Sequence, residues 1–351
     1  MTGRSRTLAG VVALALVLAA GAAYLVLRNP EARSAPRSCN GYEALCALRL
    51  DQVSLAATHN SMNAAADGFE DPSQEVGIEA QLAQGVRGLL VDAYLGVVRT
   101  AGSRQIVYTD VSDKRLGTLA NAVGDEEVQH ALRLREEAGR PPADAPRDVY
   151  LCHSYCELGA VPFSQTVEVL RHFLEENPDD VLVMIIQDEL DAERLVPVLE
   201  DGGLEPYLAR LDPSAPLPTL EEMAESGQRL VVGLENGDLA PLLPNVYDSG
   251  LLQEVPYDYS SLAELEDPRS CRPHRGQDGA PLFLLNHWVT PPSAEVAAEA
   301  NAEDVLLGRA RRCAEERGQP VNLVAVDFAG SGDLLATVDA LNGQASDVPS
   351  S

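Results

Sequence analysis

The chain has 351 residues with 54 acidic and 26 basic side chains, so its formal net charge at pH 7 is −28. Such a charge is repelled by the phosphate backbone of nucleic acids, which argues against a nucleic-acid-binding protein, and it also opposes docking on anionic lipid. The length suits one large domain with short extensions, since (β/α) barrels take about 250 residues.

The first 28 residues predict a targeting segment. Arg4 and Arg6 precede an almost wholly apolar run that ends at Leu27, and about 20 apolar residues can span a bilayer. We expect an uncleaved signal anchor at residues 1–28. A cleaved signal peptide is the alternative, because the small residues at 19–23 offer a cleavage site. Either segment predicts a domain outside the cytoplasm, on a single-pass protein of the cell membrane or on a secreted protein.

The rest of the chain is interpreted as a linker at 29–38, one domain at 39–345 and a tail at 346–351. Within the domain, strand-like apolar runs alternate with helical patterns, and most of the runs are continuous, as in parallel strands buried on both faces. The predicted strands are Val53–Thr58, Gly88–Tyr94, Val149–His153, Val181–Gln187, Arg229–Leu234, Leu282–Asn286 and Leu323–Phe328. The predicted helices are Val76–Gln84, Ser164–Glu176, Ala192–Glu200, Leu220–Glu225, Ala294–Glu316 and Gly332–Leu341.

This alternation predicts the α/β class and a (β/α) TIM-type barrel, whose regularity is open because no eighth strand is evident. Residues 97–148 are an insertion, with an extended pair and a helix near Glu126–Ala138, and residues 202–218 and 236–280 are long loops. A doubly wound open sheet is the alternative fold. It usually carries a Gly-rich turn after its first strand, where this chain has Thr58-His59-Asn60-Ser61.

The chain has six cysteines, and an even number in an exported protein indicates disulfide bonds. The sequence alone does not choose among the pairings. Proximity suggests Cys39–Cys46 and Cys152–Cys156, which leaves Cys271–Cys313. Zinc binding is the alternative, but the spacings do not resemble paired C-x-x-C knuckles.

Polar side chains end four of the predicted strands. His59 and Asn60 follow the first strand, Asp92 lies in the second, His153 ends the third and Asp327 lies in the last. Because a (β/α) barrel builds its active site at the C-terminal ends of its strands, we expect these side chains to converge. Two histidines in such a site can act as a base and an acid, since imidazole titrates near neutral pH.

Residues after two other strands are further candidates for the wall of a pocket. Asn286, His287 and Trp288 end one strand, and Trp288 could stack on a sugar ring or pack in the core. Glu235 and Asn236 follow another strand and are weaker candidates.

The order of Ala57–Ser61, Gly85–Asp92 and Leu151–His153, followed by Val324–Phe328, resembles the X-domain of phosphatidylinositol-specific phospholipase C. More broadly, it resembles the phospholipase-C-like phosphodiesterase superfamily, over roughly residues 50–345. The resemblance implies a phosphoric diester hydrolase or lyase, in which a hydroxyl of the substrate attacks phosphorus to give a cyclic phosphate.

The resemblance also implies roles for individual residues. His59 would be the general base that activates the attacking hydroxyl, and His153 would be the acid that protonates the leaving oxygen. Asp327 would hold the base histidine in its tautomer, as a triad aspartate does. The expected partners are a phosphodiester substrate, for example an inositol phospholipid, and the membrane through the N-terminal segment. A monomer is expected.

A divalent cation follows from the same resemblance. Calcium-dependent members carry Asn directly after the base, which Asn60 matches, and two acidic residues on the second strand. Asp92 matches one of these, but Leu90 stands in place of the other. Gln187 and Asp188 are the further expected donors. Calcium usually takes 6–8 oxygen ligands, so a site that lacks one carboxylate is expected to bind Ca²⁺ weakly.

Two other functions remain open from the sequence. A glycerophosphodiester phosphodiesterase needs a Glu-x-Asp pair on the second strand, which Leu90-Val91-Asp92 breaks. A catalytically inactive barrel that acts as a binding protein of the cell envelope is favoured by Leu90 and opposed by the two histidines. Calcium-independent bacterial members of the resembled family carry an arginine where this chain has Asp92.

Overall fold

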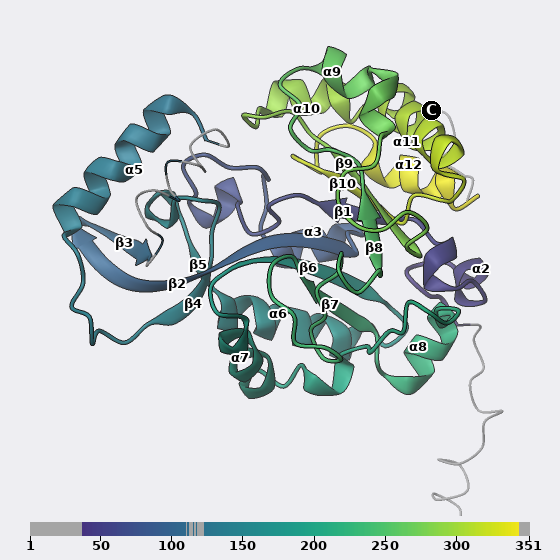
Figure 1. Ribbon diagram of the computed structural model, residues 1–351, viewed down its shortest axis with the longest axis horizontal. Coiled ribbons are helices and arrows are strands. Elements are labelled where there is room, and N and C mark those ends of the chain that lie inside the picture. The colour runs from purple at the N-terminus through teal and green to yellow at the C-terminus, as the bar shows by residue number, and fades with distance from the viewer. Residues whose placement is uncertain (1–36, 110, 112–114, 116, 118–122, 344–351) are drawn as a thin grey trace, which may run out of the picture. The chain divides into compact units, whose positions relative to one another are not determined.

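The computed structural model describes residues 37–109, 111, 115, 117 and 123–343 (Figure 1). The predicted signal anchor at 1–28, most of the linker and the tail at 346–351 lie outside the described residues. Within the described part of the chain, no helix has both the length and the apolar character needed to cross a bilayer.

A single sheet of ten strands forms the centre of the domain. Seven of its strands pair in parallel with one another, and most of the continuous apolar runs predicted in them are buried as expected. In their order across the sheet, these strands are β8 (Leu252–Glu254), β9 (Leu282–His287), β10 (Leu323–Val326), β1 (Leu55–Thr58), β2 (Gly88–Ala101), β6 (Leu182–Glu189) and β7 (Leu230–Leu234).

The sheet curls into a half-barrel, and among the described strands β7 and β8 do not pair. The α/β class is therefore confirmed, whereas a closed barrel is not formed. The reason lies at the free edge of β7, where the loop that follows the strand turns back. Leu234 donates its N–H to the carbonyl of Pro244 and accepts from the N–H of Val246, both at 2.9 Å. The edge that a closing strand would need is thus already hydrogen-bonded.

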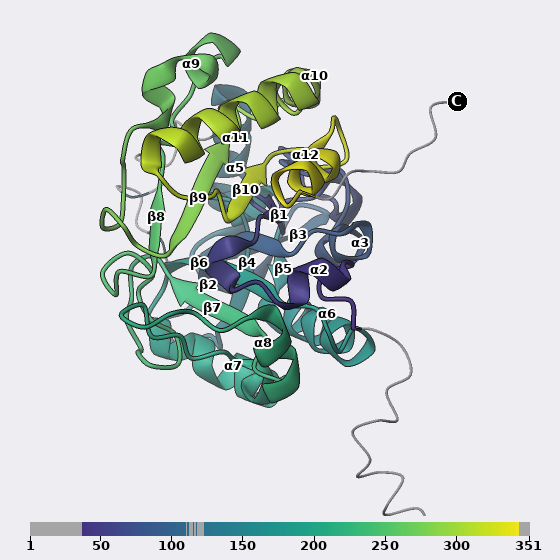
Figure 2. The same cartoon turned by 90° about the vertical axis from the view of Figure 1, so that its right-hand side faces the viewer.

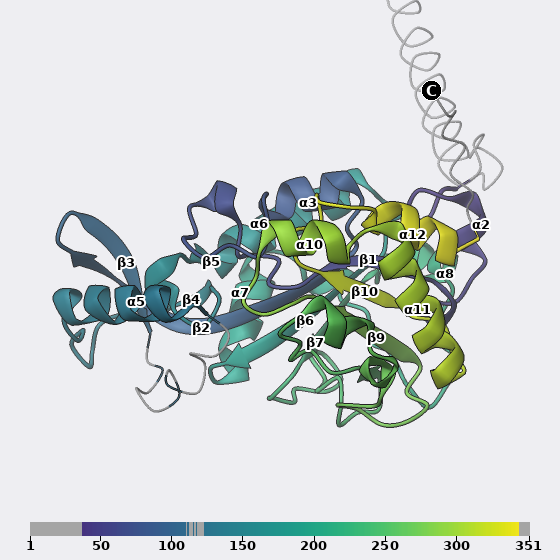
Figure 3. The same cartoon turned by 90° about the horizontal axis from the view of Figure 1, so that it is seen from above.

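Strand β2 is fourteen residues long, and its second half leaves the parallel sheet to support an antiparallel extension (Figure 3). There it pairs with β3 (Arg104–Thr109) and β4 (Asp148–Leu151), and β4 pairs with the short β5 (Val161–Pro162). The predicted extended pair in the insertion is confirmed. The prediction of a barrel strand at 149–153 is wrong, because β4 runs antiparallel to β2.

Helices cover the sheet at both ends of the strand order. Figure 2 shows α10, α11 and α12 at one end and α6, α7 and α8 at the other. The α-helices are α2 (Glu43–Cys46), α3 (Ile78–Gln84), α5 (Asp125–Ala138), α6 (Phe163–Glu176), α7 (Leu195–Asp201), α8 (Leu220–Ser226), α9 (Leu262–Glu266), α10 (Ala294–Ala300), α11 (Glu303–Arg317) and α12 (Leu334–Leu341). Short 3₁₀ turns are η2 (Leu50–Gln52), η3 (Ala65–Asp67), η5 (Cys156–Leu158), η6 (Ala192–Arg194), η7 (Glu205–Tyr207) and η8 (Pro268–Cys271).

The helix predicted at 294–316 is divided into α10 and α11 at Asn301. The buried side-chain amide of Asn301 donates to the carbonyls of Asp327 and Ser331, at 2.9 and 3.0 Å. This break in the helix therefore fixes the loop that follows β10, which carries Asp327.

All six cysteines form disulfides, in the three pairs that proximity suggested: Cys39–Cys46, Cys152–Cys156 and Cys271–Cys313. The zinc alternative is therefore wrong.

Candidate active site

Three side chains of the site form one row across neighbouring parallel strands. Thr58 on β1 pairs with Val326 on β10, and Val326 pairs with His287 on β9. His59 follows Thr58, Asp327 follows Val326 and Trp288 follows His287. The parallel register therefore brings together residues that are far apart in the sequence.

His59 is held at its ring by Asp327 and Trp288. Its Nδ1 lies 2.8 Å from Oδ1 of the buried Asp327. Nδ1–H donates to this carboxylate, which leaves Nε2 as the ring nitrogen for a substrate. The indole of Trp288 stacks on the face of the imidazole, with ring centroids 3.7 Å apart and planes 4° from parallel. Burial raises the pKa of Asp327, while the ion pair and hydrogen bond with His59 oppose that shift.

The backbone around His59 is fixed as well. The side-chain amide of buried Gln74 donates to the carbonyls of His59 and Val326, at 2.8 and 3.0 Å. The next residue, Asn60, has a φ of 46°, in the left-handed region that asparagine tolerates better than most residues.

His153 reaches the site from the antiparallel part of the sheet. It follows β4, where the N–H of Cys152 donates to the carbonyl of Asp92, and the Cys152–Cys156 disulfide closes the turn behind it. Its ring centroid lies 6.4 Å from that of His59, with the planes at 73°. Burial, followed by the nearby His59, lowers the pKa of His153 to about 3. The imidazole of His153 is therefore neutral near pH 7 when the cavity holds no anion.

Both histidines line one cavity of about 520 Å³. The wall beside them includes Asp92 and Leu90 from β2, Gln187 from β6, and Arg115 from the insertion. Burial raises the pKa of Asp92 well above its usual value, and the neighbouring Glu235 and Glu189 add to this effect. The guanidinium of Arg115 is paired with Glu189, with Nε 3.2 Å from Oε2.

The cavity wall also carries a second polar cluster, centred on Arg275. Its guanidinium binds Glu235 through Nη1 at 2.8 Å and Glu254 through Nε at 2.5 Å. The hydroxyl of Tyr247 donates to Glu254 at 3.0 Å. The Asn286 amide donates to Glu254 and to the carbonyl of Val255, at 3.1 and 2.7 Å.

Asn286 is 1% exposed, and its Oδ1 has no hydrogen-bond partner among the described residues. Asn286 is among the residues that line the cavity.

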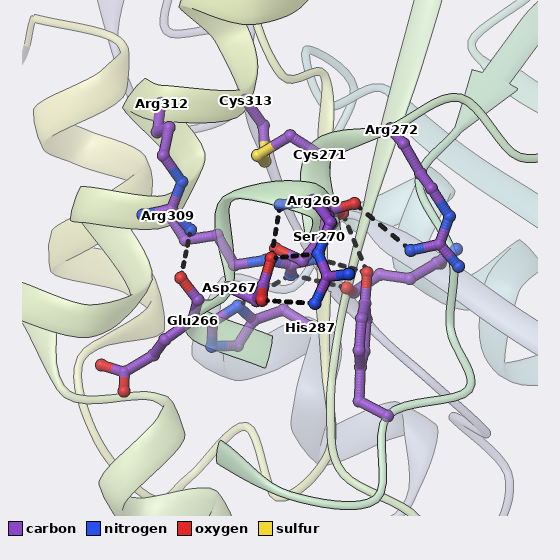
Figure 4. Close-up of a disulfide and its surroundings, with 12 residues drawn as sticks. Glu266, Asp267, Arg269, Ser270, Cys271, Arg272, His287, Arg309, Arg312 and Cys313 are labelled. Atoms are coloured by element: carbon purple, nitrogen blue, oxygen red, sulfur yellow. Dashed lines mark hydrogen bonds and ion pairs between the residues drawn. A yellow bond between two sulfur atoms is a disulfide. The ribbon is translucent and has the colours of Figure 1, made fainter. Parts of the chain in front are cut away.

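The loop that contains Tyr257 and Tyr259 completes this wall and is tied to α11 through Arg309. Figure 4 shows Arg309 and Ser270 near the Cys271–Cys313 disulfide. The buried guanidinium of Arg309 donates to the hydroxyl of Tyr259 and to Oγ of Ser270, both at 3.0 Å. The Cys271–Cys313 disulfide provides a covalent link between the same two segments. Burial lowers the pKa of Arg309 to about 10.

The predicted calcium donors do not come together as expected. Asp188 faces away from the cavity, and its carboxylate accepts from the backbone N–H groups of Asn236 and Gly237, at 2.9 and 2.8 Å. The predicted placement of Asp188 is wrong because successive residues of a strand face opposite sides, so Gln187 on β6 faces inward and Asp188 outward.

The remaining donors do not fit a calcium site. Asp92 is the one carboxylate left in the predicted set, Leu90 presents an apolar side chain beside it, and the Asn60 amide is 3.4 Å from Oγ of Ser73. The described residues contain no group of three His, Cys, Asp or Glu side chains that could hold a metal ion.

Several residues of the cavity were missed by the sequence analysis. Arg115, Glu254 and Arg275 all line it, and each lies in a segment that was predicted to be an insertion or a loop. The two leucines at 251 and 252 are a weak strand signal that could have identified β8. Of the two weaker candidates, Glu235 lines the cavity and Asn236 does not. Of the other three, Asn286 and Trp288 line it, whereas His287 is completely buried and is not part of its lining.

Comparisons with known proteins agree with this architecture. A model of the PI-PLC X family (PI-PLC X 1) matches residues 138–342, a range that includes His153 and Asp327 but neither His59 nor Asp92. A PI-PLC X domain-containing protein of Arabidopsis thaliana is 24% identical over 226 residues, which are 57% of this chain and 50% of that protein. An uncharacterized secreted protein of Arthroderma benhamiae is 21% identical over 327 residues, which are 86% of this chain and 62% of that protein.

Solved structures resemble the chain in fold. A phosphatidylinositol-specific phospholipase C of Staphylococcus aureus has a TM-score of 0.52 at 11% identity, over 85% of this chain and 94% of that chain. A phosphatidylinositol-specific phospholipase C of Listeria monocytogenes has a TM-score of 0.47 at 14% identity, over 86% and 97%. The family model covers more than half of the 351 residues, and the chain therefore belongs to the PI-PLC X domain family.

Proposed function

We propose that this protein is an extracytoplasmic phosphodiesterase of the phosphatidylinositol phospholipase C type, in which His59 is the base and His153 is the acid. The observation that carries the proposal is the placement of two imidazoles 6.4 Å apart in one cavity, one of them bound to a buried carboxylate. Two such rings can flank one phosphodiester group, with the attacking oxygen near one and the leaving oxygen near the other.

In the proposed reaction, Nε2 of His59 removes a proton from a hydroxyl of the substrate. The hydroxyl oxygen then forms a bond to phosphorus, and the bond from phosphorus to the leaving oxygen breaks. His153 gives its proton to that oxygen, so the products are a cyclic phosphodiester and a free alcohol. Asp327 orients His59 and stabilises the imidazolium that forms.

The low pKa of His153 has a consequence for this scheme. In the cavity without substrate, His153 is neutral near pH 7. A phosphodiester carries a negative charge, and an anion close to an imidazole raises its pKa. Binding of substrate is therefore expected to be coupled to uptake of the proton that the acid donates.

Positive charge near the phosphate can come from Arg115, which lines the same cavity. Its guanidinium is paired with Glu189 in the structure. If a substrate phosphate replaced Glu189 as the partner, the guanidinium of Arg115 would remain ion-paired. A guanidinium bound to phosphate oxygens stabilises the charge that develops during the displacement.

The Arg275 cluster supports a head group that is a neutral polyol. Among the described residues, the cavity wall contains five carboxylates, Asp92, Glu235, Glu254, Asp258 and Asp327, against two arginines. A head group with additional phosphates would be repelled by this excess, whereas hydroxyls can donate to carboxylate oxygens of the wall. The proposed substrate class is therefore a polyol phosphodiester.

Location outside the cytoplasm is supported by the three disulfides and by the relative named a secreted protein. The alternative of a catalytically inactive barrel has Leu90 in the cavity wall as its support.

A direct test uses the full-length chain with a chromogenic inositol phosphodiester and follows phosphorus NMR of the products. A cyclic phosphate is expected from the active chain and not from His59→Ala. A glycerophosphodiester phosphodiesterase would instead release an acyclic monoester without a cyclic intermediate. Turnover that is equal in His59→Ala and the unaltered chain would overturn the proposal, and no turnover in either would favour the inactive barrel.

A further inference from the structure

Trp288 is the single tryptophan of the chain, and its indole covers one face of the His59 imidazole. The indole is 6% exposed. We propose that Trp288 is a positioning residue for His59, which fixes the plane of the imidazole by stacking and stabilises the ring when it carries a proton. The catalytic part of this inference rests on the proposed function, whereas the stack itself does not.

The stack supplies a restraint that Asp327 cannot supply. The hydrogen bond at Nδ1 holds one edge of the imidazole at 2.8 Å, but the ring could still tilt about that bond. A flat indole at a centroid distance of 3.7 Å and an angle of 4° removes this freedom. The two contacts together fix the direction in which Nε2 points, and the productive geometry of a base depends on that direction.

The backbone that carries Trp288 is anchored on both sides. Before it, His287 is completely buried, with Nε2 2.9 Å from the carbonyl of Ala300 and Nδ1 3.1 Å from the guanidinium of Arg309. Figure 4 shows His287 and Arg309 beside the Cys271–Cys313 disulfide. After it, the N–H of Thr290 donates to the carbonyl of Tyr259 at 2.8 Å. The indole is therefore presented by a fixed segment.

The stack also places an aromatic face against the imidazolium that forms in the proposed reaction. The face of an indole carries partial negative charge, so it attracts a cation that lies over it. When His59 takes the substrate proton, the imidazolium lies against this face on one side and against Asp327 at its edge. This attraction is stronger in the protonated state than in the neutral state, and such a difference accelerates the chemical step.

The activity test compares Trp288→Leu with Trp288→Phe in the full-length chain. Leucine removes the aromatic face, so kcat is expected to fall roughly tenfold, a size that matches a cation–π contact. Phenylalanine keeps an aromatic face, so kcat is expected to stay within about threefold of the unaltered chain. KM is expected to change little in both variants. Equal losses in the two variants, or an effect on KM alone, would overturn the positioning role.

A second measurement tests the stack without any substrate. Because the chain has one tryptophan, its fluorescence reports on Trp288 alone. His59→Ala removes the stacked ring and is expected to change the intensity and wavelength of the emission. His153→Ala is the matched control, since that ring lies 6.4 Å from His59 and approaches it edge-on.

The two measurements separate the possible failures. An emission spectrum that His59→Ala leaves unchanged would overturn the stack and with it the proposal. A changed emission in a protein that has no phosphodiesterase activity would establish the contact and overturn the catalytic part together with the proposed function.

Discussion

The rings of His59 and His153 meet in one cavity although they follow strands of opposite kinds. His59 follows β1, which is parallel to both of its neighbours, and His153 follows β4, which is antiparallel to the long β2. Their 6.4 Å separation is therefore produced by the unusual length of β2, which supports both the parallel sheet and the antiparallel extension.

The two histidines are predicted to differ in how strongly they depend on the leaving group. His59→Ala should lower kcat by about 10²–10⁴-fold on any substrate, because activation of the hydroxyl is always needed. His153→Ala should cause a similar loss with an alkyl leaving group but a much smaller one with nitrophenol, which departs without a proton. The measurement is kcat for both variants on an alkyl and a nitrophenyl diester. Equal losses of His153→Ala on both substrates would contradict its role as the acid.

Removal of divalent cations by a chelator is predicted to change the activity of the unaltered chain by less than about twofold. The reason is that the donors in the cavity do not match the 6–8 oxygens that calcium prefers. Leu90→Glu adds a carboxylate beside Asp92 and is the matched variant, in which a response to calcium could arise. The measurement is the rate after exhaustive chelation and after return of Ca²⁺. Loss of activity on chelation with recovery on calcium would show that the donor set of Asn60, Asp92 and Gln187 is sufficient.

Removal of the Cys271–Cys313 disulfide is predicted to affect both stability and substrate binding. The disulfide closes a loop over a sequence separation of 42, so the chain-entropy model gives a loss of about 4 kcal/mol in the free energy of unfolding. The loop with Tyr257 and Tyr259 would also loosen, so KM should rise more than kcat falls in the double serine variant. Denaturant titration and steady-state kinetics measure the two effects.

The control for that variant is the double serine variant of Cys39 and Cys46. The disulfide that it removes joins residues with a sequence separation of 7 and does not line the cavity. Its expected loss of stability is about 2 kcal/mol, with KM unchanged. A rise in KM of equal size in both variants would contradict a specific role of the Cys271–Cys313 link in the cavity wall.

Acid is predicted to destabilise the fold through His287. Burial, followed by Arg309, lowers the pKa of this histidine to about 3, whereas an unfolded chain has a value near 6.5. Between these two values the unfolded chain binds a proton that the folded chain does not. The free energy of unfolding therefore falls as the pH falls through this window, by up to about 1.4 kcal/mol per pH unit from this group.

Denaturant titrations from pH 4 to pH 7 test this for His287→Gln, which keeps a donor for the carbonyl of Ala300. The variant should show a shallower slope than the unaltered chain, and the difference between them cancels the contributions of other groups, including His153. His172→Gln, at an exposed site on α6, is the matched control. Identical slopes in all three proteins would show that His287 does not titrate differently on folding.

The sequence by itself determined the features that depend on local burial. Continuous apolar runs identified β1, β2, β6, β7, β9 and β10, because strands buried on both faces must be apolar throughout. The polar residues that interrupt those runs, His59, Asp92 and Asp327, could be recognised for the same reason. Proximity along the chain also suggested the three disulfide pairs that form.

Only the tertiary structure decided which long-range segments share the cavity. Arg115, Glu254 and Arg275 come from segments with weak periodicity, and their approach to the site depends on how those segments pack on the sheet. Asp188 was misplaced because the direction of a side chain depends on which face of a strand is inside. The stack of Trp288 on His59 depends on the register of β1, β10 and β9, and no local pattern records which strands become neighbours.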